Sequence, residues 1–587
     1  MTGTTDWRRL AAPAGILLAA FLAFGQTLRV GFMWDDHRMI EQNPHIALSA
    51  ADLERAFKGD PFDEGLNYYR PLQTVSDMAD FAVWGLRPAG YHLTNLLFHA
   101  AAALLFFYLA LELGFPRPAA FWAAVLLAAH PAAVEQLLVV AGRAELASSA
   151  CLLASLLLFL RGGDALSFVL FLAAMGFKEN GVVTPALAAL SLWYLKRPKA
   201  EYRRLIPFFA AIPLYLLARH AALGMGIFSR GFQPVLSGLF LKVPQTVLVY
   251  LKEAVLPFDM HSHRMEPQSA LLNWTALPAL AAAAWLLFRR GSRTGLFCAG
   301  WYLLNLSPKM PLLAANDLML DHWVYLGNAG LFVWAAAALY PRPRLRPLLP
   351  AAAAALVLAS AFNIPKRNGD LKNYEYSALY SSSKPMLYNL AREYYSRGAF
   401  LKSEVLLERI CAQAPDDPLY LNGLALARWK TGDVPGALKA LDAALALRPG
   451  DPDTLFNRYS VLRGAGRDSE AAETVAGILR LKPDYIPAQL ALARSAAADG
   501  GDGKAEGIYE KVLAEDPVNL EALNDYGILL ARRGDLAGAE KLFRKALGIA
   551  PGLHSAAENL RRLQEIRAGG VPAAERKVSG AVRPGTP

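Results

Sequence analysis

Two adjacent carboxylates, Asp35 and Asp36, follow directly after the first long apolar run of the 587-residue chain. This is where a first membrane helix would leave the bilayer. A carboxylate pair at such a place is either a solvated loop turn or a general base held against a membrane-borne substrate, where it would accept a proton from an attacking hydroxyl group. The charged residues of the remaining chain bear on the choice between the two.

The motif GFKENG places Lys178 and Glu179 between two short apolar runs, 164–177 and 182–195. Because such runs are too short to lift a loop fully clear of a bilayer, we expect both side chains inside a polar cavity. The alternative is an ordinary hairpin tip. The candidate substrate-binding residues on this predicted outer side are Arg143, Lys178, Glu179, Arg219, Arg264 and Arg70.

His261 and His263 are potential metal ligands together with Asp35, but an HSH tripeptide is more often a polar surface turn. The three cysteines lie far apart, and two of them fall inside apolar runs, so they indicate neither a disulfide framework nor a Cys-based metal site. We expect small core residues at Cys151, Cys298 and Cys411.

The elements that must position these residues are membrane helices. Hydrophobic residues make up 54% of the chain, charged residues 19%, and the mean hydropathy is +0.25, which is too apolar for an ordinary soluble protein. A net charge of +10 would suggest nucleic acid in a soluble chain. Here the Lys and Arg residues gather in short loops between apolar runs, where they set topology, so we expect no nucleic-acid partner.

A helix needs about 20 apolar residues to cross the hydrocarbon, and shorter ones are tolerated inside a bundle. The chain accordingly predicts eleven spans. They are 10–30, 91–114, 119–140, 146–160, 164–177, 182–195, 205–220, 273–288, 295–312, 319–340 and 347–364. The first ends in charged residues without a small-residue cleavage site, so we expect a retained span and not a cleaved signal.

A cytoplasmic N-terminus, favoured by Arg8 and Arg9, places Lys or Arg in every inner loop, as the positive-inside rule requires. This topology holds only if residues 236–256 do not cross. Lys242 and Pro244 in that run favour an amphipathic helix lying on the outer face.

Four stretches resemble one known family in their order and spacing. They are WDDHRMIEQNPHI, YYRPLQTVSDMADFAVWGLRPAGYHLTNLLFHA, HPAAVEQLLVVAGRAEL and GFKENGVVTPAL. Together they resemble the transmembrane and tetratricopeptide repeat-containing O-mannosyltransferases, which are members of the GT-C superfamily of membrane glycosyltransferases. The segment DHWVYLG, 321–327, departs from the Glu-Arg-Tyr-Leu-Tyr-Leu-Pro-like stretch of that family.

The resemblance implies a multispanning fold whose first outer loop supplies an acidic catalytic residue, and a sugar donor carried on a polyprenyl phosphate. Asp35 is the first candidate for the base and Asp36 the second, because Asp35 aligns with the first acidic residue of the family's Asp-Glu pair. The leaving phosphate requires Arg or Lys at the membrane surface. Arg143 is the first candidate for this contact to the phosphate. The alternative role for Arg143 is an anchor at the end of a helix, paired to Glu145. The nearest family members are thought to be metal-independent, so we expect no metal and no cofactor.

Beyond residue 365 the apolar runs give way to an internal repeat of 34 residues. The register is kept by Pro415, Pro449, Pro483, Pro517 and Pro551, by Gly398, Gly432, Gly466, Gly500 and Gly534, and by Ala437, Ala471, Ala505 and Ala539. Gly between the helices, Ala in close helix contact and Pro after the second helix define the tetratricopeptide repeat. Five repeats would form a right-handed solenoid with a concave groove. We expect that groove to be lined by Tyr388, Asn422, Phe456, Leu490 and Asn524.

The predicted fold is all-α: a polytopic GT-C-like helical bundle of about 11 spans, followed by an α-solenoid. The predicted domains are a transmembrane domain over 1–364, with outer loops at 31–90 and 221–272; a linker over 365–383; repeats and a capping helix over 384–568; and a disordered tail over 569–587.

Three functions fit these observations. The first is transfer of a sugar, mannose or a related one, from a polyprenyl-phosphate donor to Ser or Thr of exported proteins held by the repeats. The second keeps the transfer but has a cell-envelope lipid or glycan as acceptor and the repeats as a scaffold. The third is a membrane-anchored scaffold without catalysis, against which WDDHR, AGRAE and GFKENG argue. For the enzyme we expect a multi-pass protein of a bacterial inner membrane, in contact with membrane lipid, with its active site and repeats on the periplasmic side.

Overall fold

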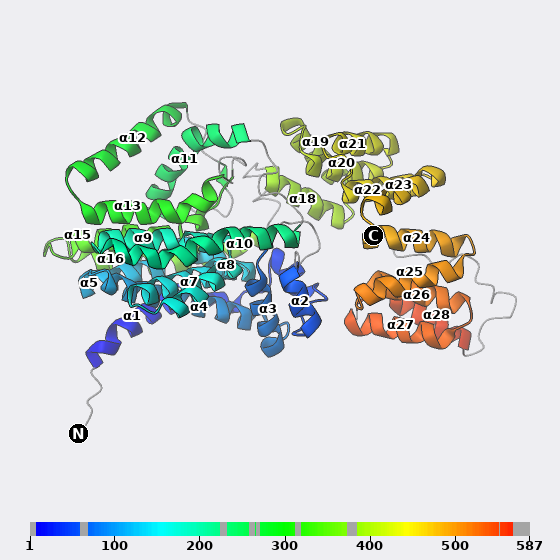
Figure 1. Ribbon diagram of the computed structural model, residues 1–587, viewed down its shortest axis with the longest axis horizontal. Helices are drawn as coiled ribbons and strands as arrows, with labels where there is room; N and C mark the ends of the chain where they lie inside the picture. Colours follow the sequence, from blue (N-terminus) through cyan, green and yellow to red (C-terminus); the bar gives the residue numbers. More distant parts are fainter. Residues whose placement is uncertain are drawn as a thin grey trace, which may run out of the picture. The chain divides into compact units, whose positions relative to one another are not determined.

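The computed structural model describes residues 7–58, 69–223, 232–257, 264–265, 270–311, 318–372, 384–550 and 552–567. The chain divides into two compact units, Met1–Ser383 and Lys384–Pro587. The predicted all-α fold is confirmed, except for one short β-ladder described below. Figure 1 labels the helices of both units.

The first unit consists of α-helices joined by short helical turns, labelled η. Its elements are α1 Trp7–Phe24, η1 Gly25–Arg29, η2 His37–Glu41, α2 Ala50–Lys58, α3 Pro71–Trp84, α4 Pro88–Glu112, α5 Arg117–Ala129, η3 Pro131–Ala133, α6 Val134–Leu138, η4 Val140–Gly142, α7 Arg143–Leu160, α8 Asp164–Phe177, η5 Glu179–Val183, α9 Thr184–Tyr194, η6 Lys199–Leu205, α10 Ile206–Leu223, α11 Phe232–Val255, β1 Arg264–Met265, α12 Ala270–Arg289, α13 Arg293–Leu306, η7 Ser307–Lys309, β2 Leu318–Met319, η8 Asp321–Val324, α15 Gly327–Leu339 and α16 Leu348–Lys372.

Every apolar run predicted to span the membrane contains a helix. Within the described residues, five helices are long and apolar enough to cross, or six if α5 and the segment Pro131–Leu138, bent by 46°, count as one span. Other runs form shorter apolar helices, as in α8 and α15. One predicted boundary is wrong: in the run 319–340 the α-helix begins only at Gly327, because residues 318–324 form a strand and a 3-10 turn. The number of eleven spans stays a prediction.

Helix α7 lies at the centre of the first unit. Its Leu146, Leu153 and Leu156 are fully buried in the largest apolar cluster, and the helix packs against α4 and α8. The last helix of the unit returns to the first, since α16 packs on α1 and α5. The Gln26 side-chain amide donates to the Ala361 carbonyl at 2.6 Å. This closure keeps the loop that carries the acidic pair attached to a rigid bundle.

The run predicted to lie on the outer face, 236–256, belongs up to Val255 to one continuous helix, α11. It is not among the helices that pass the length and apolarity test for a span. Its buried Tyr250 donates to the Leu320 carbonyl at 2.8 Å, next to the antiparallel ladder in which β1 pairs with β2. α11 therefore packs against the segment that follows α13, and its placement on the outer face of the membrane stays a prediction.

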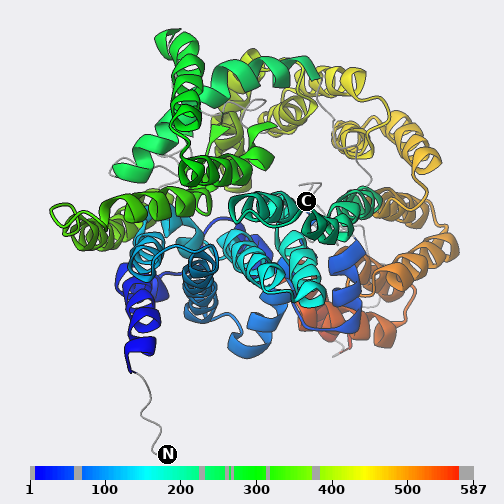
Figure 2. The same cartoon turned by 60° about the vertical axis from the view of Figure 1, so that its left-hand side comes forward.

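The second unit is a series of antiparallel helix pairs, visible in Figure 2. Its elements are α18 Lys384–Ser396, α19 Phe400–Gln413, α20 Pro418–Thr431, α21 Val434–Leu447, α22 Pro452–Gly464, α23 Asp468–Leu481, α24 Ile486–Ala498, α25 Asp502–Glu515, α26 Leu520–Arg532, α27 Leu536–Ile549 and α28 His554–Arg567.

The sequence period explains how these helices turn and pack. The five glycines spaced by 34 all have left-handed φ angles, from +74° at Gly466 to +97° at Gly432, a conformation that residues with a Cβ atom rarely adopt. The alanines in register, such as Ala437 and Ala505, are fully buried, where only a small side chain lets two helices approach closely. The repeat pattern thus specifies both the turn and the helix contact.

Candidate active site

Asp36 is completely buried and binds three backbone N–H groups. Its Oδ2 atom accepts from Met33 at 3.1 Å and from Val140 at 3.1 Å, and its Oδ1 atom accepts from Ala141 at 3.1 Å. Both carboxylate oxygens are therefore engaged. Asp36 fastens the loop after α1 to the short turn η4 that precedes α7.

The turn η4 forms because the helical conformation is interrupted between α6 and α7, at Gly142. A Cβ atom at Gly142 would come within 2.3 Å of the Gln136 Cα atom, so only glycine permits this close approach. The break leaves the N–H groups of Val140 and Ala141 available to Asp36 instead of to an α-helix. The Asn95 side chain donates to the Val140 carbonyl at 3.2 Å and holds the same turn from α4.

Asp35 is exposed, in contrast to its neighbour. It follows Trp34, which has a left-handed φ of +54°, an unusual and strained value for a bulky residue. The backbone N–H of Asp36 donates to the Met33 carbonyl across this turn at 3.0 Å. Asp35 is thus held, exposed, on a turn that Asp36 fixes from behind.

Burial raises the pKa of Asp36 to about 7, although its three backbone N–H donors oppose the shift and Asp35 adds to it. A buried carboxyl group with both oxygens occupied is poorly placed to take a proton from an acceptor hydroxyl group. The geometry therefore favours Asp35 over Asp36 as the base.

Arg143, the first predicted phosphate ligand, is fully buried in a polar enclosure. It forms ion pairs with Asp77, at 2.9 Å, and with Asp80, both on α3. Its Nε donates to Asn95 at 3.0 Å. Its partners are these carboxylates and not Glu145, so neither predicted role describes it. With no exposed surface, Arg143 offers no face to a lipid phosphate.

Glu145, two residues later on α7, is the centre of a second cluster. Its Oε2 pairs with Lys178 at 2.8 Å, and its Oε1 pairs with Lys309 at 3.2 Å. Asn180 donates to it at 2.9 Å. Two ammonium groups therefore share one carboxylate, which leaves an excess of positive charge. Lys309 is not among the residues predicted for the site; its only signal in the sequence is an ionisable residue near the end of an apolar run.

A third pair lies beside this cluster. Arg70 binds Glu179 through two parallel contacts, Nη2 to Oε1 at 3.0 Å and Nε to Oε2 at 3.2 Å. Burial opposes ionisation, but the Arg70 guanidinium lowers the pKa of Glu179 to about 2. Tyr215 of α10 lies within electrostatic range of Arg70, Glu179 and Arg219. The structure thus brings four predicted residues, Arg70, Lys178, Glu179 and Arg219, to one region.

The acidic pair and the Glu145 cluster both lie at the N-terminal end of α7. Asp36 binds the chain at Val140 and Ala141, and Glu145 comes four residues after Ala141, about 6 Å along a helix. Gln73, three residues after Arg70, donates to the Ala141 carbonyl at 3.3 Å. Residues far apart in the sequence therefore meet at one end of the bundle.

The segment 321–327, which departs from the family pattern, supports the second cluster. The Trp323 carbonyl accepts from Lys309 Nζ at 2.6 Å, and His322 lies 3.3 Å from Glu135. Asp321 faces Arg367 of α16 at 3.7 Å. Its polar side chains bind protein groups in this arrangement, and the segment holds Lys309 toward Glu145.

Three other predicted residues fall wholly or partly outside the residues that the structure describes. His261 and His263 lie outside the described residues, and only the backbone of Arg264 is described, in β1. Among the residues that the structure describes, no group of three or more His, Cys, Asp or Glu side chains is placed to hold a metal ion.

The five predicted groove residues of the repeats fall into two sets. Leu490 and Asn524 are buried, at 1% and 4% exposure, and so belong to the packing between helices. Asn524 accepts from Asn559 at 2.9 Å. Tyr388, Asn422 and Phe456 are partly exposed, and Asn422 accepts from Asn457 at 2.9 Å.

Comparison with known families supports the identification of the repeats. Residues 388–452, 422–486 and 490–554 match the family model described as tetratricopeptide repeat. Among solved structures, the chain is similar to a thermophilic TPR protein, TTC0263 of Thermus thermophilus, at 24% identity, covering 31% of this chain and 99% of that one with a TM-score of 0.28. It is also similar to PilF of Pseudomonas aeruginosa, at 17% identity, covering 33% and 88% with a TM-score of 0.28.

Curated relatives confirm the resemblance predicted from the motifs. Protein O-mannosyl-transferase Tmtc1 of Drosophila melanogaster is 34% identical over 202 residues, which cover 32% of this chain and 24% of the relative. Protein O-mannosyl-transferase TMTC2 of Homo sapiens is 30% identical over 234 residues, covering 35% and 28%. The matches therefore span about a quarter of the length of these relatives.

Proposed function

We propose that the protein is a membrane glycosyltransferase that transfers mannose from a polyprenyl-phosphate donor to Ser or Thr hydroxyl groups of protein acceptors. The observation that carries the proposal is the different environment of the two acidic residues. Asp36 is bound by three backbone N–H groups, and Asp35 beside it is exposed. The named relatives support mannosyl transfer to proteins as the reaction.

The reaction requires one proton transfer and one displacement. Asp35 accepts the proton of the acceptor hydroxyl group while its oxygen attacks the anomeric carbon. The bond from that carbon to the phosphate oxygen breaks, and the electron pair leaves with the lipid phosphate. A negative charge then develops on the phosphate in a partly dehydrated site, where fixed cations stabilise it most.

Lys178 and Lys309 are the cations best suited to that phosphate. They share a single carboxylate, so they carry positive charge that Glu145 does not neutralise. The Lys178 side chain is 12% exposed, which gives a ligand an approach that the enclosed Arg143 lacks. Arg219 lies nearby, and Arg70 is paired with Glu179 beside the cluster. Arg143 acts in this proposal as a positioning residue that fixes α3 to α7.

The repeat unit supplies the protein-binding function. Tetratricopeptide solenoids suit extended segments, whose Ser and Thr hydroxyl groups are free to enter an active site. Tyr388, Asn422 and Phe456 are the partly exposed candidates for such contacts. This handover requires the repeats to emerge on the same face of the membrane as Asp35, which an odd number of spans gives.

Membrane sidedness is tested with single cysteines in a background in which Cys151, Cys298 and Cys411 are replaced by Ala. Lys504→Cys, on an exposed position of α25, should react with a membrane-impermeant thiol reagent from the outer side. Arg344→Cys, in a basic loop expected on the inner side, is the matched control and should react only after the membrane is opened. The reverse pattern would place the repeats inside and remove their proposed role in presenting the acceptor.

The activity itself is tested with the purified full-length chain, synthetic polyprenyl-phosphate mannose and two acceptors, a Ser/Thr-containing peptide and a lipid glycan. We expect a mannosylated peptide and release of polyprenyl phosphate. Mannose on the glycan alone would make the repeats an assembly scaffold and refute protein transfer. If neither acceptor is mannosylated and the donor stays intact, the result would contradict the proposed transferase activity.

A further inference from the structure

A basic pocket lies at the end of the bundle opposite the acidic pair. It has a volume of ≈ 490 Å³ and is lined by Trp193, Lys196, Arg197, Lys199, Tyr202 and Arg293. Such a volume falls within the range of ~300–1,000 Å³ typical of small-ligand sites. Its lining contains four cations, two amphipathic aromatic residues and no carboxylate.

The position follows from the two helices that connect the pocket to the Glu145 cluster. Helix α9 begins just after η5 and ends at Tyr194, beside the pocket. Helix α13 begins at Arg293 in the pocket, and the turn η7 with Lys309 follows its other end. At about 1.5 Å per residue the two helices are about 17 Å and about 21 Å long, so the pocket and the cluster lie toward opposite ends of the bundle.

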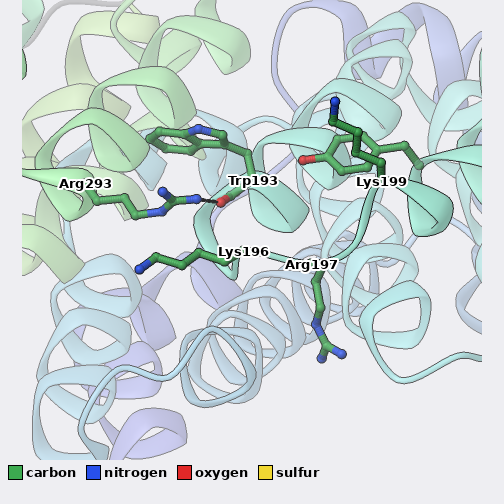
Figure 3. Close-up of a pocket in the computed structure, with 6 residues that line it drawn as sticks. Trp193, Lys196, Arg197, Lys199 and Arg293 are labelled. Atoms are coloured by element: carbon green, nitrogen blue, oxygen red, sulfur yellow. Dashed lines mark hydrogen bonds between the residues drawn. The ribbon is translucent and has the colours of Figure 1, made fainter.

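Figure 3 shows how the pocket is assembled. Arg293 donates through Nε to the Tyr194 carbonyl at 3.0 Å, donates through Nη2 to the Trp193 carbonyl, and lies over the Trp193 ring at 4.5 Å. Arg197 extends away from Lys196 and Arg293 in this view, and it lies 3.8 Å from Glu201. Among the residues that the structure describes, Lys196 and Lys199 form no ion pair. Their charges are therefore available to an anion.

The surroundings of the pocket are apolar, as expected where a lipid supplies the anion. Ile206 and Phe209 follow η6 on α10, and Leu286 and Phe288 lie near the end of α12 that precedes Arg293; all four are exposed. Acyl chains would cover these residues while the headgroup occupies the pocket. Trp and Tyr are the residues that favour the headgroup level of a bilayer. Basic pockets between membrane helices on the inner side bind anionic headgroups.

We propose that this pocket binds the phosphate of an anionic phospholipid in the leaflet opposite the candidate active site. Lys196 and Lys199 contribute the positive charge. Arg293 fixes Trp193 in the lining of the pocket, and the apolar residues of α10 and α12 contact the acyl chains. The site does not depend on the proposed transfer reaction. It would anchor the bundle in the inner leaflet.

The test uses the full-length protein in nanodiscs of phosphatidylcholine containing a minor fraction of phosphatidylglycerol. After the protein is released from the nanodiscs, native mass spectrometry measures how much of each lipid stays bound to it. We expect selective retention of phosphatidylglycerol. The double variant Lys196→Gln, Lys199→Gln should weaken it about 25-fold, at about fivefold for each surface charge.

The matched control is Arg342→Gln, Arg344→Gln, which removes two exposed charges from a basic loop that does not line the pocket. It should retain phosphatidylglycerol like the wild type. Equal losses in both variants would reduce the effect to general surface charge and overturn the site. Equal retention of both lipids by the wild type would also overturn it. Displacement of the lipid by millimolar inorganic phosphate would identify a soluble-phosphate site instead.

Discussion

Two ion clusters at the start of α7 have opposite compositions. At residue 143 one guanidinium is shared by two carboxylates, Asp77 and Asp80, and is fully buried. At residue 145 one carboxylate is shared by two ammonium groups, Lys178 and Lys309, and Lys178 keeps some exposure. The first cluster has no cationic capacity left for a ligand. The second has an excess of positive charge close to the loop that carries Asp35.

The two charged residues of the motif AGRAE therefore have different expected roles: Arg143 is structural, and Glu145 holds the cations of the proposed donor site. A buried ion pair contributes little net stability, because desolvation offsets attraction, but breaking one leaves an uncompensated charge. Arg143 therefore has its largest effect on folding. In the proposed reaction Lys178 and Lys309 stabilise a lipid phosphate, so their largest effect should be on donor use.

The largest expected effect is that of Arg143→Met on stability. Asp77 and Asp80 would remain buried without their cation, which costs about 3–5 kcal/mol. Thermal unfolding of the purified protein should show a large drop in midpoint. Adding Asp77→Asn and Asp80→Asn to the same chain should recover part of it, because the stranded charges are removed. A variant as stable as the wild type that uses its donor poorly would return Arg143 to the phosphate site.

Lys178→Gln should reverse this pattern. Glu145 keeps Lys309 and Asn180 as partners, so the unfolding midpoint should change little. Loss of a charge-assisted contact to phosphate costs about 1.5–3 kcal/mol, or about ten- to a hundredfold in kcat/KM for the donor. Lys58→Gln, which removes an exposed lysine at the end of α2 in the predicted first outer loop, is the control and should leave donor use unchanged. Unchanged donor kinetics in Lys178→Gln would make the Glu145 cluster purely structural.

The Arg70–Glu179 pair predicts a smaller, pH-dependent effect. The pKa of Glu179 is lowered from 4.5 to about 2 in the folded protein, so the unfolded chain takes up the proton first as the pH falls. The stabilisation is complete above about pH 4.5 and is lost between about pH 4.5 and 2. Because the carboxylate is one-third exposed, we expect about 1 kcal/mol or less. The midpoint difference between wild type and Glu179→Gln should shrink across this window; a constant difference would exclude the pair as its cause.

Local patterns predicted the helices and the repeats, because both depend on residues close in the sequence. The glycines spaced by 34 specified each inter-helix turn, and the apolar runs specified the helices of the first unit. Pairing within the site depends on residues far apart. Nothing near Arg143 indicated that its partners would be Asp77 and Asp80, more than sixty residues earlier, or that Glu145 would bind Lys309.

The acidic pair shows the same limit at shorter range. Asp35 and Asp36 are chemically identical in the sequence, and only the resemblance to a family ranked them. Their difference arises because the break at Gly142 leaves two N–H groups for Asp36 to bind. Similarly, Leu490 and Asn524 keep the repeat register of the predicted groove residues but are buried between helices.

The measurement that tests the account most directly compares Asp35→Asn with Asp36→Asn in mannose transfer and in thermal unfolding. Asp35→Asn should lower transfer by about 10²–10⁴-fold, the usual contribution of a general base, with an unchanged midpoint because the side chain is exposed. Asp36→Asn should lower the midpoint, because each backbone N–H left unpaired costs about 1–3 kcal/mol of the free energy of unfolding. Full transfer by the double variant Asp35→Asn, Asp36→Asn would contradict the catalytic assignment.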